Sequence, residues 1–161
     1  MALVGYVTLE EANDIVTQLY VSTSTEAVLW ASLSDEDKQA LLNRAFYRIE
    51  SLPFLGAKSE SGQEYQFPRD GATEVPTEVK LAEVTEALTG DKVREDNNKY
   101  AMMSARGISS YRIGNLSESF GARSASASSV FDNLTNIVAI ETLQYLGTWL
   151  QGGYQICRNR Y

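Results

Sequence analysis

The sequence predicts a mainly α-helical protein: a small helical bundle, a β-hairpin or extended arm, and a C-terminal helix with a tail. Apolar residues recur at spacings of three and four along much of the chain, which is typical of amphipathic helices. Residues that favour helix starts precede these stretches. Strand-like character appears chiefly in one short segment near residue 110, although Ile137 to Ile140 alone could also form a strand. The length of 161 residues indicates one domain overall. We expect a helical core at 1–90, an arm with a Ser-rich connection at 91–129, and an apolar helix with a docking tail at 130–161.

Three helices are expected before residue 53. Thr8 and Glu11 form a capping-box pattern that begins the first helix. A second, short helix carries Trp30. Ser34 then caps a longer helix, which Pro53 and Gly56 end. The apolar side chains of this longer helix recur at helical spacing: Leu41, Leu42, Ala45, Phe46, Ile49 and Leu52.

A polar loop is expected at 57–75, interrupted by the turn Phe67-Pro68-Arg69. A guanidinium held beside a rigid proline can bind a loop carbonyl, so these three residues are interpreted as a loop anchor. Pro76 suits the first position of the next helix, which is expected to end at Gly90.

The chain after residue 90 changes character. The stretch 91–99 is charged and is expected to be exposed, and 102–120 is expected to form the hairpin or arm, with a turn at Gly114-Asn115. A Ser-rich connection follows, and then an apolar helix is expected from Val130 to Leu150. The apolar residues of the arm are candidates for contacts between subunits: Ile108, Tyr111, Ile113 and Phe120. The tail combines aromatic residues and arginines, which suit a docking peptide: Tyr154, Ile156, Arg158, Arg160 and Tyr161.

The composition removes most kinds of chemistry. Histidine is absent, which excludes His-dependent triads and His-zinc sites, and the single cysteine cannot form an internal disulfide. Neither phosphate-binding glycine motif occurs. The net charge of -7 argues against a duplex nucleic acid ligand. We therefore expect no catalytic, cofactor or metal site, and a soluble intracellular protein without a membrane span.

Three functional alternatives were weighed against structural ones. The carboxylates Glu83, Glu86 and Asp91 could bind a metal ion, but Glu83 and Glu86 are expected on the solvated face of their helix. Cys157 beside Arg158 could be a nucleophile, but no general base accompanies it. The remaining alternative is a surface for single-stranded nucleic acid, and packing of Trp30 and Phe67 in the core is favoured over it. Its stacking and charged residues would be Trp30, Tyr65, Phe67, Lys58, Arg69 and Lys80.

The order of motifs resembles the head-tail connector family of tailed phages, some members of which carry a DnaT-like single-stranded-DNA-binding label. The resemblance rests on TLEEANDIV, a Trp-containing segment, ALLNRAFYRIESLPFLG, YQFPRDG and VPTEVKLAEVTEAL, and on the later ISSYRIGNLSESF. It covers most of residues 8–120. The apolar stretch at 130–150 departs from the short polar ends of many members.

The resemblance implies a virion protein at the head-tail interface, made in the host cytoplasm and without enzyme activity. It would form a homo-oligomeric ring, typically a dodecamer, below the portal protein and offer a platform to a stopper or tail-completion protein. DNA would pass through the lumen without sequence-specific binding, which an acidic chain permits. The alternative function is a single-stranded DNA-binding replication accessory protein.

Overall fold

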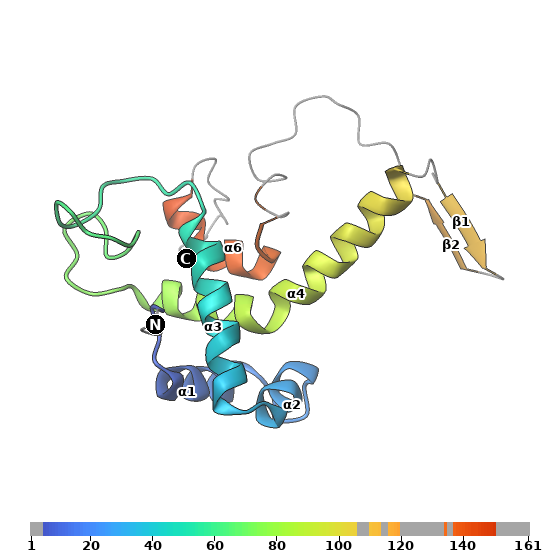
Figure 1. The fold of residues 1–161 in the computed structure, drawn as a ribbon, viewed down its shortest axis with the longest axis horizontal. Helices are drawn as coiled ribbons and strands as arrows, with labels where there is room; N and C mark the ends of the chain where they lie inside the picture. Colours follow the sequence, from blue (N-terminus) through green and yellow to red (C-terminus); the bar gives the residue numbers. More distant parts are fainter. Residues whose placement is uncertain (1–4, 106–109, 114–115, 120–133, 135–136, 151–161) are drawn as a thin grey trace, which may run out of the picture.

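Helices form most of the described chain, which confirms the predicted fold class (Figure 1). The structure is a computed structural model that describes residues 5–105, 110–113, 116–119, 134 and 137–150. The elements in chain order are α1 (Leu9–Leu19), α2 (Thr25–Ser32), α3 (Asp35–Glu50), α4 (Thr77–Ala105), β1 (Ser110–Ile113), β2 (Leu116–Ser119), α6 (Ile140–Leu146) and the 3-10 turn η1 (Gly147–Trp149).

α1 and α3 begin at the predicted caps, and α2 begins after Ser24, a cap that was not predicted. Thr8 and Glu11 make both hydrogen bonds of the capping box: the Thr8 N–H donates to Glu11 Oε2 at 2.8 Å, and the Glu11 N–H donates to Thr8 Oγ1 at 3.2 Å. The hydroxyl of Ser24 accepts from the Ala27 N–H at the start of α2, and Ser34 caps α3. These bonds satisfy N–H groups that a helix leaves without partners in its first turn.

The core is built where α3, α4 and α6 pack together. Phe67 reaches it from the loop between α3 and α4, and its ring packs edge-on against Tyr6, Phe54 and Trp149 with centroids 4.9–5.8 Å apart. A second buried cluster joins α1 and α2 to the same two long helices and includes Trp30. The prediction that Trp30 and Phe67 fill the core is therefore confirmed, since they are 4% and 3% exposed.

The fourth helix is longer than predicted. α4 continues through Gly90 to Ala105, so the expected end at Gly90 is wrong. The helix bends along its length, and its outer half rises away from the body (Figure 1). We call residues 91–105 the outer half of α4; they include the charged stretch after residue 90. The boundary expected between the helical core at 1–90 and the arm at 91–129 therefore falls inside α4.

The arm ends in the predicted hairpin. β1 and β2 pair antiparallel, with Ser110 opposite Ser119 and Ile113 opposite Leu116. The hairpin lies beyond the outer end of α4 (Figure 1). Tyr111 belongs to β1 as well, whereas Ile108, the expected turn at 114–115 and Phe120 lie outside the described residues.

The C-terminal helix is shorter than expected. A continuous helix from Val130 to Leu150 is wrong for the described part, because residues 137–139 are not helical and α6 starts only at Ile140. The backbone of Ala139 is extended, with ψ of 152°. After η1 the chain returns to the loop that follows α3, where the Leu55 N–H donates to the Trp149 carbonyl at 2.7 Å. The tail residues 151–161 lie outside the described part of the chain.

The burial of Phe67 predicts how its substitution changes stability. Phe67→Ala should lower the free energy of unfolding by roughly 3–5 kcal/mol, because it leaves a cavity among aromatic rings. Tyr47→Ala is the matched control: Tyr47 is 60% exposed, and its loss should change stability by about 0.5 kcal/mol or less. Urea unfolding monitored by circular dichroism measures both. Equal effects of the two substitutions would contradict the placement of Phe67.

Candidate functional site

The predicted loop anchor is present, and Arg69 is its centre. The guanidinium donates to the carbonyl oxygens of Leu55 at 2.9 Å and Gly56 at 2.6 Å, and to Oε1 of Gln66 at 2.8 Å. Arg69 is 7% exposed and follows a cis peptide bond between Phe67 and Pro68. These bonds join the start of the long loop to the turn at Phe67-Pro68-Arg69, so Arg69 holds the loop backbone.

The aromatic residues considered for base stacking are mostly committed to packing. The Trp30 indole N–H donates to Asn13 Oδ1 at 2.8 Å, and the indole lies in the core cluster of α1 and α2. Tyr65 is partly buried against the main core, with its ring 5.0 Å from that of Phe46. A stacking platform needs an open ring face. Trp30 and Phe67 do not provide one.

A buried ion pair connects α3 to α4. Arg48 Nη1 lies 3.1 Å from Glu86 Oε1, and the two side chains are 8% and 0% exposed. The second terminal nitrogen of Arg48 lies 2.6 Å from Asp91 Oδ1, and Arg44 also pairs with Asp91. A guanidinium can bind two carboxylates because its five N–H donors are arranged as a fork. This network holds α4 at Asp91, where its outer half begins.

The other oxygen of Glu86 holds the start of α6. Glu86 Oε2 accepts the Ala139 N–H at 2.8 Å and the Thr142 hydroxyl at 2.9 Å. Ala139, the N-cap residue of α6, makes no side-chain capping bond. Glu86 holds the start of the helix in another way, through the N–H of Ala139 and the hydroxyl of Thr142. The negative charge also lies at the favourable end of the helix dipole. The helix can therefore begin at Ile140, which explains why it does not extend back to Val130.

Both carboxylates that were expected on a solvated face are instead buried. Glu83 and Glu86 are each 0% exposed, so that expectation is wrong. Glu86 forms an ion pair with Arg48, whereas Glu83 accepts a hydrogen bond from the Tyr6 N–H at 2.7 Å. Burial, the larger effect, raises the pKa of Glu83 to about 8, while the backbone N–H groups of Tyr6 and Val7 oppose the rise. Glu83, Glu86 and Asp91 do not converge on a common point that could hold a metal ion. Within the described ranges, no group of three or more His, Cys, Asp or Glu residues could do so.

Gly90 allows the ion pair to form. A Cβ atom at this position would overlap Glu86 Oε1 and approach Arg48 Nη1 to 2.5 Å. The glycine is therefore required for close contact inside a helix, and it does not mark the helix end.

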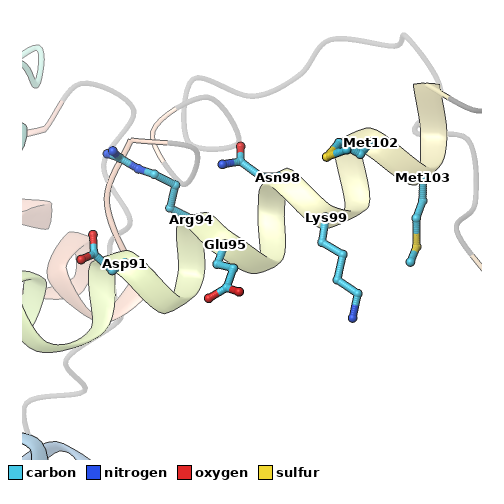
Figure 2. A pocket seen from close by; sticks show the side chains of 7 residues that line it. All are labelled: Asp91, Arg94, Glu95, Asn98, Lys99, Met102 and Met103. Atoms are coloured by element: carbon cyan, nitrogen blue, oxygen red, sulfur yellow. The ribbon is translucent and has the colours of Figure 1, made fainter.

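The outer half of α4 carries a surface pocket. The volume of this pocket is about 550 Å³. Figure 2 shows Arg94, Asn98 and Met102 on one side of the helix and Glu95, Lys99 and Met103 on the other. Met102 is 57% exposed, so an apolar side chain accompanies charges of both signs. The surface is therefore mixed in character, with cations, carboxylates and apolar side chains.

The cations of the helical body are largely used inside the molecule. Ion pairs or hydrogen bonds within the chain engage Lys38, Arg44, Arg48, Lys58, Arg69 and Lys80. The exposed cations Lys92, Arg94 and Lys99 share the outer half of α4 with Asp91, Glu95 and Asp96. Charges of both signs are therefore interspersed along this part of the helix. In the part of the chain with described side chains, they do not form a basic stripe of the kind that follows a nucleic acid backbone.

The proposed docking residues of the tail lie outside the described residues, as does Cys157. Of the arm residues, only Tyr111 and Ile113 are placed, both in β1. The structure thus brings together Arg48, Glu86, Gly90 and Asp91, a group that the sequence patterns did not single out as a site. No described helix is long and apolar enough to cross a membrane.

The ion pair makes a sharp stability prediction. Arg48→Met should lower the free energy of unfolding by about 3–5 kcal/mol, because it leaves the Glu86 charge buried without its partner. Arg44→Met is the matched control, with a half-exposed side chain and the same partner Asp91; it should cost about 1 kcal/mol or less. Chemical denaturation measures both variants, and equal costs would contradict a buried pair.

Gly90 allows a test in which two physical effects have opposite signs. Helix propensity alone predicts that Gly90→Ala stabilises by about 1 kcal/mol. The overlap with the buried ion pair predicts destabilisation instead, and we expect this effect to win because both charged groups are confined. The melting temperature measured at one fixed pH distinguishes them: an increase would show that the pair can move aside.

Comparison with known proteins identifies the family. Residues 5–156 match the family described as "Putative DnaT-like ssDNA binding protein". Searches of curated proteins and of solved structures found no match. The family match includes the whole helical body, the arm and most of the C-terminal segment. The chain therefore belongs to the DnaT-like family to which this description applies.

Proposed function

We propose that the chain is a structural assembly subunit that joins its neighbours through the outer half of α4 and the hairpin. The observation that carries this proposal is the placement of this arm, which leaves the body and ends in β1 and β2 (Figure 1). A two-stranded hairpin alone is marginally stable in water. A partner chain that packs against it would stabilise it.

The base of the arm is held in place by ion pairs. The helix is continuous from the core to Ala105, and Asp91 is bonded to both Arg44 and Arg48 at its base. An arm that only linked two segments would not need this support. We infer that its direction matters for assembly.

The finer proposal is a head-tail connector of a tailed phage. The chain would then form a ring of twelve copies, as the resemblance implies, below a portal protein and above a stopper or tail-completion protein. Tyr111 and Ile113 would contact neighbouring subunits, and the tail from Tyr154 to Tyr161 would contact the portal. DNA would pass through the acidic lumen, and no enzyme activity is required.

A second candidate is single-stranded DNA binding, in the role of a replication accessory protein. The family description favours it directly, since it names this activity and mentions no virion role. The charges that would serve it are Lys92, Arg94 and Lys99 on α4, with further arginines outside the described ranges. The net charge of -7 and the intramolecular bonds of the other cations weigh against it.

Two parallel experiments separate the candidates. For assembly, analytical ultracentrifugation and electron microscopy of the protein, alone and mixed with a portal protein, should show rings or portal-bound copies. Tyr111→Ser with Ile113→Ser should abolish these assemblies and leave the helical circular dichroism spectrum intact; removal of 151–161 should abolish portal binding alone. A protein that stays monomeric with and without portal would overturn the assembly proposal.

For DNA binding, fluorescence anisotropy with a labelled oligonucleotide should show binding at low salt that weakens steeply as salt increases. Replacing Lys92, Arg94 and Lys99 with glutamine should reduce the salt slope by about 0.7 for each lost phosphate contact. Absence of binding at low salt would exclude this second candidate. Binding that is unchanged by the triple substitution would place the DNA site elsewhere in the chain.

A further inference from the structure

The segment that precedes α1 is held down by one tyrosine. The Tyr6 ring packs against Phe46 and Phe67, with centroids 4.9 and 5.8 Å away. Its hydroxyl donates to Glu50 and accepts the Phe67 N–H at 3.3 Å. Its backbone N–H donates to Glu83 Oε2 at 2.7 Å. The segment 5–8 thus contacts α3, α4 and the long loop at once.

The carboxyl group of Glu83 lies beneath this segment and is only half satisfied. The side chain is fully buried, and its Oε1 atom has no hydrogen-bond partner. A Cβ at Gly5 would come within 2.7 Å of that oxygen, so the segment covers it closely. No cation among the described side chains pairs with Glu83.

The charged and titratable groups around Glu83 do not favour its ionised form. Glu11 of α1 and the Tyr6 phenol are the neighbours that interact with it electrostatically, and Glu50 of α3 lies beyond the phenol. Glu11 is already paired with Lys80 at 2.6 Å, and the hydrogen bond from Lys80 is the main reason that its pKa is lowered. Burial raises the pKa of Tyr6, so the phenol keeps its proton when Glu83 loses its own.

We propose that Glu83 is a proton-operated latch for the segment Gly5–Thr8. With its proton, the carboxyl group is neutral and can stay buried under Gly5 and Tyr6. When the proton leaves to solvent, the carboxylate carries a buried charge whose Oε1 has no donor. Lifting of the segment would hydrate this charge and would also free the Thr8 cap of α1. The device goes beyond the proposed function and does not depend on it.

The direction of the pH dependence follows from linkage. The pKa of Glu83 is about 8 in the closed state and near 4.5 when the carboxyl group is hydrated. The closed segment therefore binds more protons than the open one between these values. The latch contributes its full stability below about pH 4.5, and this contribution is lost as the pH rises through 8.

Hydrogen exchange of the Tyr6 and Val7 amides tests the latch in the full chain. After correction for intrinsic exchange, their protection should fall by up to about tenfold per pH unit between pH 5 and 8 and level off above. The Leu42 amide in α3 reports global opening and should remain better protected throughout. Constant protection of Tyr6 would overturn the proposal, as would simultaneous loss of protection at Tyr6 and Leu42.

Two variants and one spectroscopic signal complete the test. Glu83→Gln should make Tyr6 protection independent of pH, whereas the control Glu10→Gln, at an exposed residue of α1, should leave the wild-type profile unchanged. If Glu83→Gln does not fold, the ¹³C shift of the Glu83 carboxyl carbon in the wild-type chain decides. A titration midpoint near 8 supports the latch, and a midpoint near 4.5 overturns it.

Discussion

The buried pair between Arg48 and Glu86 is the interaction on which the rest of the structure depends. One carboxylate binds α3 through Oε1 and the first residues of α6 through Oε2. The same guanidinium reaches Asp91, where the outer half of α4 begins. The body, the C-terminal helix and the arm are therefore joined by one network of ion pairs and hydrogen bonds. A buried pair of this kind adds little to stability compared with apolar packing, but loss of either partner is costly.

Much of the N-terminal half could be predicted because its signals are local. The caps at Thr8, Ser24 and Ser34 bind N–H groups three residues away, and the apolar spacing in α3 follows the turn of the same helix. The role of Arg69 was also predictable, since its partners lie in the loop that it holds. In each case the sequence contains both interacting groups within a short stretch.

The predictions for Gly90, Glu83 and Glu86 were wrong because each of these residues contacts a residue far away in the sequence. Gly90 ends a helix by local rules, yet here it makes room for a side chain from α3. Glu83 and Glu86 are ordinary surface residues by type, and their burial depends on Tyr6 and Arg48, which are 77 and 38 residues away. One signal was present: Arg48 occupies the same helical stripe as Leu41, Ala45 and Leu52, and Glu83, Glu86 and Gly90 continue the stripe of Val79. Charged residues in an apolar stripe indicate pairing across an interface, although the sequence does not specify the partner.

The shared use of Glu86 has a consequence for how this sequence can vary. Position 90 must remain small while positions 48 and 86 carry a long cation and a carboxylate, and the start of α6 must present N–H and hydroxyl donors to the same acid. A change at any one of these positions leaves the others with unmet bonds or a clash. Positions 48, 86, 90 and 142 should therefore vary together across homologues, as one correlated group that spans α3, α4 and α6. An exchange of all of them for apolar residues of matched volume is the route by which a relative could lose the charge and keep the fold.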